Sequence, residues 1–324
     1  MQNVQDILNN LRRDIETCEL PHAAYQAQLE FLTRRIQQAL NGFAPAIEVI
    51  VGPTRVGKSM LVNALLQTFR TTQTPGKRQI EVLKVKILKS VTTKMLPWVF
   101  LHALKVPIPT RMNEVELTFY LVQQLKLLGV RVIVVEEASK FVEEGAKVPA
   151  RGVADWLFDL TEDAKVTLLL FGVPRLLRLV RSNEQFRSRA SAPREFRPYD
   201  YRVPKELASF LSCLKTYCEK FRIASYPIEV PMNVLWPNVY LVSGGSVGEV
   251  ATFMGKLIDQ LHGHAFRAVV FDDCEAAAEA MSSAGDPQHR PFSSKEVQPL
   301  ALSAAHAALL TRAEMQPRPL KATA

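Results

Sequence analysis

The sequence predicts an α/β protein with a doubly wound parallel sheet of five strands, helices before the sheet and a helical lid after it. Between residues 44 and 204, short apolar segments alternate with helical patterns, and a glycine-rich turn follows the first of them. After Pro204 the apolar spacing becomes helical throughout. Repeated strand–helix–strand units form parallel sheets with helices on both faces, which is the basis of this prediction.

Two amphipathic helices are expected before the sheet, at residues 3–18 and up to Leu40, where Asn41-Gly42 is a suitable C-cap. The apolar or alternating segments predict strands at residues 46–51, 79–88, 131–135, 166–171 and near 195–202. Helical patterns lie between them at residues 59–69, 95–104, 113–128, 153–161 and 174–181.

The remaining chain divides into a helical lid and a tail. Helices are expected at residues 207–221, 232–241, 247–261 and about 272–281. The predicted boundaries are therefore an N-terminal helical segment at 1–43, a sheet domain at 44–204, a lid at 205–282 and a flexible tail at 283–324. The tail is rich in proline, but an apolar patch at 300–310 makes it a candidate docking peptide for a partner.

The composition indicates a water-soluble globular protein. Of its 324 residues, 48% are hydrophobic, yet no run reaches the ~20 apolar residues that a membrane span needs. The N-terminus has no basic head followed by an apolar run, and the four cysteines are scattered. We therefore expect no membrane association and a reduced, cytoplasmic setting.

The glycine-rich turn is a complete phosphate-binding loop (P-loop) between a predicted strand and a predicted helix. In such a loop, backbone N–H groups surround a phosphate, the lysine reaches the β- and γ-phosphates and the following hydroxyl binds Mg²⁺. The motif predicts that ATP and Mg²⁺ are the cofactors. The residues expected to contact the nucleotide are Gly52, Pro53, Thr54, Arg55, Val56, Gly57, Lys58, Ser59 and Met60.

Two acids end the third predicted strand, where a P-loop enzyme needs a metal ligand and a base for the attacking water. We expect Glu136 to bind Mg²⁺ together with Ser59, and Glu137 to polarise the water. Glu136 is one methylene longer than aspartate, which predicts a weaker metal contact and slow hydrolysis. The alternative is a pair of solvated carboxylates at a strand end.

Basic residues suggest two further roles. The net charge is +8, which suits a polyanionic partner. Arg189, or else Arg187, is the candidate arginine that reaches the nucleotide of a neighbouring subunit, although either residue could be an ordinary surface arginine. The candidates for sequence-neutral contacts to DNA phosphates are Thr92, Thr93, Lys94, Lys147 and Arg151, with a solvated charged face as the alternative.

The motifs resemble those of the TniB/TnsC group of AAA+ ATPases, the transposition regulators of bacterial transposons. The resemblance runs from about Pro21 to Met281 and rests on the order and spacing of five segments. They are the P-loop at 51–63, Val-Val-Glu-Glu-Ala at 134–138, Leu-Phe-Gly-Val-Pro at 170–174, Gln-Phe-Arg-Ser-Arg at 185–189 and Ser-Gly-Gly-Ser-Val-Gly-Glu at 243–249.

The resemblance implies an ATP-dependent oligomer, a ring or a filament, on double-stranded DNA that connects a target-selecting protein to the transposase. Two positions depart from the usual AAA+ pattern: Val173 stands where a polar sensor follows the fourth strand, and Glu249 where the lid often carries an arginine. These departures favour a slow switch. A helicase-loader or replication-initiator ATPase, and a nucleotide-binding scaffold with little hydrolysis, are the alternatives.

Overall fold

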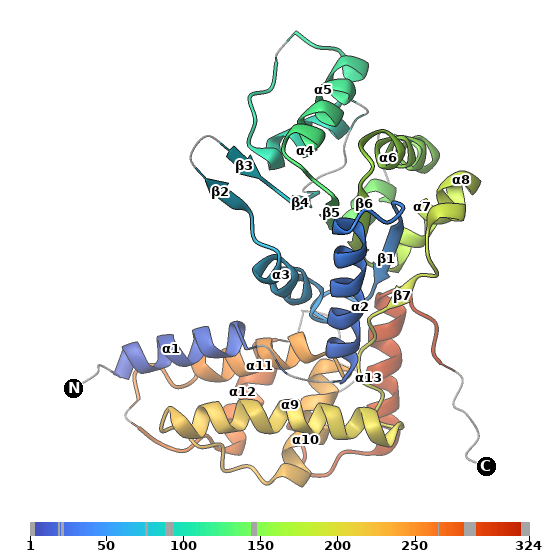
Figure 1. Cartoon of the computed structure of the whole chain (residues 1–324). Coiled ribbons are helices and arrows are strands. Elements are labelled where there is room, and N and C mark those ends of the chain that lie inside the picture. The colour runs from blue at the N-terminus through green and yellow to red at the C-terminus, as the bar shows by residue number, and fades with distance from the viewer. Residues whose placement is uncertain are drawn as a thin grey trace. The chain divides into compact units, whose positions relative to one another are not determined.

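The computed structural model describes residues 4–18, 20, 23–74, 77–87, 92, 94–109, 111–143, 148–264, 266–281 and 290–318. The chain forms two compact units, whose elements are labelled in Figure 1. The sheet unit comprises Tyr25–Gly52 and Lys58–Phe196, and the helical unit comprises Met1–Ala24, Pro53–Gly57 and Arg197–Ala324. This division differs from the expected boundaries, because the two N-terminal helices belong to different units.

The sheet unit contains a parallel sheet of five strands in the order β4-β5-β6-β1-β7, which confirms the predicted fold class. The strands are β1 (Ile47–Val51), β4 (Val82–Lys86), β5 (Val132–Glu136), β6 (Thr167–Gly172) and β7 (Arg194–Glu195). Strand β7 is shorter and earlier than the expected segment near 195–202. It ends after pairing with the last residues of β1, where the amide of Phe196 still donates to the carbonyl oxygen of Val51 at 2.7 Å.

A small antiparallel hairpin, β2 (Thr72–Thr74) and β3 (Lys77–Gln79), precedes β4 and was not predicted. The expected single strand at 79–88 therefore corresponds to the end of β3 followed by β4. The hairpin is built from polar residues, so no apolar alternation marks it in the sequence.

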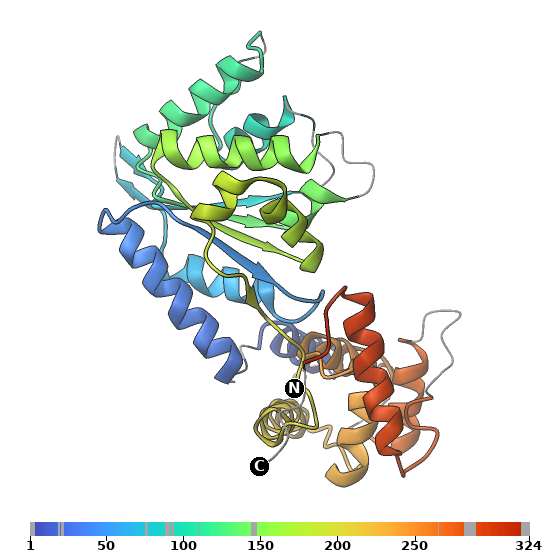
Figure 2. The ribbon, with the colours of Figure 1, turned by 90° about the vertical axis from the view of Figure 1, so that its right-hand side faces the viewer.

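Helices cover both faces of the sheet, as Figure 2 shows. Helices α2 (Ala23–Leu40) and α3 (Lys58–Thr68) lie on one face. The other face packs against α4 (Met95–Leu104), α5 (Glu114–Leu127), α6 (Ala150–Ala164), α7 (Leu177–Ser182) and α8 (Glu184–Arg189), with the short turns η1 (Ala138–Val142) and η2 (Pro174–Leu176). Val49, Val85 and Val135 belong to this second core. Because strand side chains alternate, the even-numbered residues of β1, β4 and β5 face α2 and α3.

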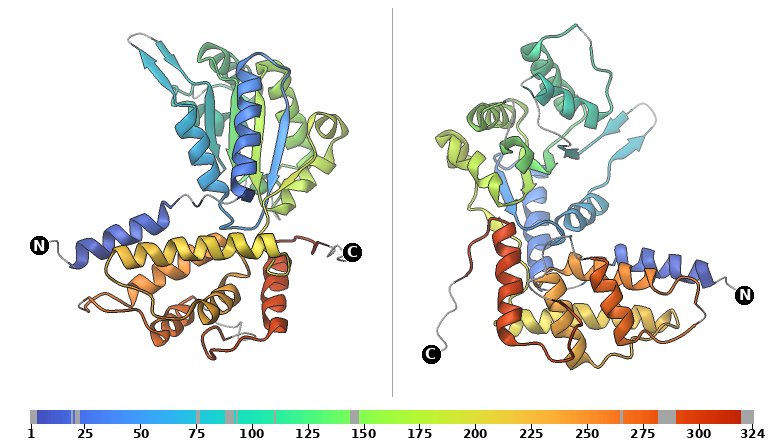
Figure 3. Two further views of the ribbon diagram at one scale, coloured as in Figure 1. Left: turned by 60° about the horizontal axis from the view of Figure 1, so that its bottom comes forward. Right: turned by 180° about the vertical axis from the view of Figure 1, so that it is seen from behind.

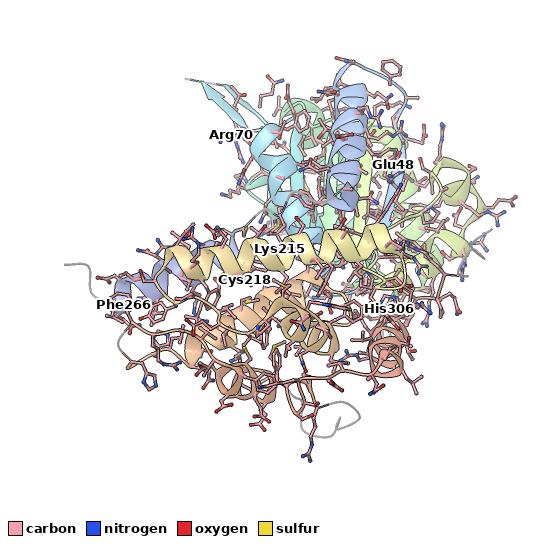
Figure 4. The ribbon with its side chains drawn as sticks, turned by 90° about the horizontal axis from the view of Figure 1, so that it is seen from below. Glu48, Arg70, Lys215, Cys218, Phe266 and His306 are labelled. Atoms are coloured by element: carbon pink, nitrogen blue, oxygen red, sulfur yellow. The ribbon has the colours of Figure 1, made fainter. Side chains whose placement is uncertain are left out.

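A buried carboxylate fixes α2 to the sheet. Glu48 of β1, labelled in Figure 4, is only 1% exposed, and its Oε1 accepts from Nε of Arg35 on α2 at 2.5 Å. The hydroxyl of Ser191 donates to the same oxygen at 2.9 Å. A charge this deeply buried requires such partners, so the ion pair sets the position of α2.

The helical unit contains α1 (Val4–Glu16), α9 (Pro204–Ile223), α10 (Met232–Ser243), α11 (Val247–Asp259), α12 (Phe271–Glu279) and α13 (Pro299–Arg312). Figure 3 shows α1 beside helices that follow it by about 200 residues in the chain. The buried face of α1 joins the core of this unit through Leu8, Leu11 and Ile15. Arg12 of α1 donates to the carbonyl oxygen of Gly255 at 3.0 Å and pairs with Asp259, both of α11.

The C-terminal segment is more ordered than expected, because residues 299–312 form α13 and pack against α10. Leu302, Leu309 and Leu310 are buried, at the spacing of one helix face. His306, labelled in Figure 4, places its Nδ1 2.8 Å from the carbonyl oxygen of Gly244 and 3.1 Å from the hydroxyl of Tyr240. Most of the apolar patch of the tail therefore packs within the helical unit, while Leu300 stays exposed. Residues 282–289 and 319–324 lie outside the described residues.

No helix in the described ranges is both long and apolar enough to cross a membrane.

Candidate nucleotide-binding site

The P-loop joins the end of β1 at Val51 to the start of α3 at Lys58. The amide of Gly52 donates to the carbonyl oxygen of Gly172 at 3.1 Å, which ties the start of the loop to β6. Gly57 has φ +103°, a conformation that only glycine adopts without strain. The sequence thus forms the loop through a glycine turn that leads directly into a helix N-terminus.

Lys58 folds over the start of its own loop. Its Nζ donates to the carbonyl oxygen of Gly52 at 2.8 Å. Burial lowers the pKa of Lys58 to about 8, and the negative charge of Glu137 acts in the opposite direction. Ser59 is exposed and Met60 half-buried on the first turn of α3. The ammonium and the hydroxyl are therefore both positioned at the N-terminus of this helix.

The middle of the P-loop, residues 53–57, packs within the helical unit against the start of α11. The hydroxyl of Ser246 donates to the carbonyl oxygen of Arg55 at 3.1 Å, and the guanidinium of Arg55 donates to the hydroxyl of Thr252. A Cβ on Gly248 would lie 1.9 Å from the carbonyl oxygen of Arg55, so only glycine fits there. The carboxylate of Glu249 is 3.8 Å from the Arg55 guanidinium. Glu249, which occupies the position of the lid arginine in the usual AAA+ pattern, therefore pairs with Arg55 of the P-loop.

The two acids at the end of β5 differ in their surroundings. Glu136 is 6% exposed, and its Oε2 lies 3.0 Å from Nζ of Lys84 on β4. Its Oε1 is buried and has no hydrogen-bond partner in the described part of the chain. Glu137 follows in the left-handed region, with φ +58°, and is half-buried where the chain turns into η1.

These donors fit a Mg²⁺ ion. Buried carboxylate oxygens are normally paired, so the unsatisfied Oε1 of Glu136 has capacity for a ligand. Carboxylate and hydroxyl oxygens are also the ligands that Mg²⁺ takes in nucleotide sites. Glu136 and Ser59 are therefore suitable ligands, although the ion pair of Glu136 with Lys84 opposes a second cation.

The candidate arginines lie on α8, whose N-cap Asn183 accepts from the amide of Phe186 at 2.8 Å. Arg189 pairs with Glu162 of α6 at 2.9 Å, while Arg187 is exposed. Both arginines therefore lie at the surface of the sheet unit, and Arg189 is held by its own chain.

The candidate DNA-binding residues follow β4 and β5. The carbonyl oxygen of Thr92 accepts from the amides of Met95 and Leu96 at 2.9 and 3.2 Å, and it thereby helps to start α4. Lys94 is exposed at the N-cap of α4, and Arg151 is exposed in the first turn of α6. Thr93 and Lys147 lie outside the described residues. Two exposed cations thus stand at helix N-termini.

The comparisons with known proteins identify the family. The model of the family described as bacterial TniB protein matches residues 7–197, more than half of the chain. This chain belongs to the TniB family. No protein with a curated description matches it.

Solved structures of similar fold come from archaeal ORC and Cdc6 proteins. ORC2 of Aeropyrum pernix, described as ADPNP-ADP complexes, is 14% identical with a TM-score of 0.61, over 95% of this chain and 86% of that one. Cdc6p of Pyrobaculum aerophilum is 12% identical with a TM-score of 0.60, over 93% of this chain and 83% of that one. At these identities the likeness shows the fold alone, which is the AAA+ fold implied by the sequence resemblance.

Sequence reasoning missed Lys84 and Asn63, whose side chains meet at 3.3 Å beside Glu136. Their residue types carried no signal, because Lys84 reads as one of several charges on a half-exposed strand. Only the register of β4 against β5 shows that it reaches the buried acid.

Proposed function

We propose that this TniB-family protein is an ATP-dependent regulator of transposition. In this proposal it assembles on double-stranded target DNA, couples target selection to the transposase and hydrolyses ATP slowly. The observation that carries the proposal is the P-loop of a TniB-family chain, whose Lys58 lies in the sheet unit with Glu136 and Glu137. Oε1 of Glu136 is buried and has no hydrogen-bond partner in the described residues.

In this proposal the P-loop binds the phosphates of ATP. Its backbone amides and the N-terminus of α3 favour the negative charge, and the Lys58 ammonium exchanges the carbonyl oxygen of Gly52 for a phosphate oxygen. Ser59 and Glu136 would hold Mg²⁺, which would supply positive charge to neutralise the phosphates. Glu137 orients and polarises the attacking water from its position after β5.

We further propose that Arg189, or else Arg187, completes the site of a neighbouring subunit. The ion pair of Arg189 with Glu162 does not prevent this, because Lys165 also lies 3.3 Å from the Glu162 carboxylate. Glu162 therefore keeps a cationic partner when Arg189 leaves. This exchange would couple oligomer formation to hydrolysis.

DNA contact is assigned to residues after β4 and β5, namely the exposed cations Lys94 and Arg151, and Thr92 two residues before Lys94. A helix N-terminus favours anions, so a cation placed there adds to its attraction for a phosphate. Contacts of this kind are independent of sequence and sensitive to salt. Docking of the transposase is assigned to the C-terminal segment, where the far side of α13 remains accessible at Leu300, which is 81% exposed.

The alternative function is that of a replication-initiator or helicase-loader ATPase, which would use the same P-loop site. The two functions share nucleotide control and differ in the partner. A binding assay with the transposase and with the replicative helicase of the same cell tests them, since the proposal expects capture of the transposase alone.

The third function, a scaffold with little hydrolysis, is tested by ATP turnover with and without duplex DNA. The proposal expects slow turnover that requires Lys58 and responds to DNA. Turnover that is absent under both conditions would favour the scaffold.

A further inference from the structure

Lys84 connects the buried acid of the candidate site to α3. Its Nζ lies 3.0 Å from Oε2 of Glu136 and 3.3 Å from Oδ1 of Asn63. Lys84 is about one-third exposed, whereas the Glu136 side chain is 8% exposed. In the parallel register Lys84 stands beside Val134, so it reaches Glu136 diagonally on the same face of the sheet.

The position of Asn63 relates this contact to the proposed metal ligands. Asn63 follows Ser59 by four residues on α3, so the two side chains lie on the same side of that helix. Lys84 therefore contacts Glu136, which is one proposed Mg²⁺ ligand. It also contacts Asn63, which lies one helical turn from Ser59, the other proposed ligand. A fixed ammonium at this position opposes the approach of a second cation to Glu136.

We propose that Lys84 is a positioning residue that competes with Mg²⁺ for Glu136. Without a divalent cation, Lys84 neutralises the buried carboxylate and holds it at the end of β5. When Mg²⁺ binds, Glu136 exchanges the ammonium for the metal, and Asn63 remains as the partner of Lys84. Formation of the nucleotide-loaded form then needs a higher Mg²⁺ concentration than it would in a site without this lysine. This inference rests on the proposed function of the same site.

Lys86 offers a matched control on the same strand. It lies directly beside Glu136 in the register, two residues from Lys84. It is exposed and makes no ion pair within the described residues. Removing its charge changes the net charge of the protein by the same amount, but it leaves the partner of Glu136 in place.

The test measures the affinity for a fluorescent ATP analogue as Mg²⁺ is raised from zero, in the presence of a chelator, to saturation. The variants are Lys84→Met, Lys84→Gln and Lys86→Met. Glutamine removes the charge but keeps a hydrogen-bond donor near Glu136, so it is the milder of the two substitutions for stability. We expect the Mg²⁺ concentration that gives half of the maximal increase in nucleotide affinity to be about tenfold lower in both Lys84 variants. A charge this close changes the affinity of a carboxylate for another cation by about tenfold, which corresponds to about one pK unit. Lys86→Met should match the unchanged protein.

A double variant isolates the mechanism. With Glu136→Gln already present, Lys84→Gln should leave the Mg²⁺ requirement unchanged, because the carboxylate that the two cations share is gone. The inference is overturned if the Lys84 variants need as much Mg²⁺ as the unchanged protein, or more, since Lys84 would then only support Glu136. Absence of any nucleotide binding by the unchanged protein at saturating Mg²⁺ would instead overturn the proposed function.

Discussion

At the scale of single residues, the lowered pKa of Lys58 predicts that nucleotide affinity depends on pH. Burial brings this pKa to about 8, so the ammonium is charged at pH 7 and loses its proton above pH 8. A bound phosphate favours the charged form, so binding above pH 8 takes up one proton. Affinity should therefore fall by up to about tenfold per pH unit above 8.

A fluorescent ATP analogue titrated between pH 7 and 9.5 measures this fall. Lys58→Arg is the control, because arginine keeps its charge over the whole range, and its affinity should be weaker but independent of pH. An unchanged affinity of the original protein up to pH 9.5 would be inconsistent with Lys58 as the phosphate-binding cation.

The two acids after β5 predict different defects. Glu137→Gln should leave nucleotide binding intact and slow hydrolysis by about 100-fold or more, because an amide cannot act as the base for water. Glu136→Gln should weaken the Mg²⁺-dependent part of binding, because it removes a metal ligand. Single-turnover hydrolysis and nucleotide titration separate the two effects, and the reverse pattern would exchange the two roles.

At the scale of elements, the contact between α11 and residues 53–57 is tested by two glycines of the same helix. Gly248→Ala places a methyl group 1.9 Å from the carbonyl oxygen of Arg55, and it should destabilise the protein by about 2 kcal/mol through overpacking. The matched control is Gly255→Ala, whose Cβ meets nothing closer than 3.9 Å. In thermal unfolding the control should melt at the original temperature or above it, because alanine favours helices. Equal melting of both variants would show that this contact is unimportant.

Helix α13 is expected to contribute to stability through its buried face. Leu309→Ala should lower the free energy of unfolding by about 3 kcal/mol, since it removes a buried side chain against α10. Leu300→Ala, on the same helix but 81% exposed, should change it little. Denaturant titration compares the two. If both variants changed the free energy of unfolding by similar small amounts, α13 would be only loosely attached. That result would agree with the flexible tail that the sequence predicts.

The sequence predicted those elements whose signal is local. Strands β1, β5 and β6 consist largely of apolar residues, and the P-loop is identified by its residue spacing, so the sequence predicts these elements directly. Strand β7 has only two residues and hairpin β2–β3 has no apolar face, so neither gives a clear pattern. The partners of Glu136 and Arg55 depend on strand register and on contacts about 190 residues apart in the chain. Such contacts leave no trace in a single sequence.

For the whole molecule, the proposed function requires that nucleotide binding control DNA binding. In the proposed function, the net charge of +8 and the exposed cations Lys94 and Arg151 would favour contact with the phosphates of duplex DNA, without sequence preference. The P-loop and the arginines of α8 would make assembly depend on ATP. Both properties must occur together in the intact protein, and neither alone distinguishes a regulator from a simple nucleotide-binding or DNA-binding protein.

The proposed dependence of DNA assembly on ATP is tested by assembling the full chain on duplex DNA with and without a non-hydrolysable ATP analogue. Sedimentation or electron microscopy should detect oligomers on DNA only when the analogue is present. Their formation should fall steeply with salt, vary little with DNA sequence and be lost in Lys58→Ala. DNA binding that is equally strong without nucleotide, or in Lys58→Ala, would show that ATP does not control assembly on DNA.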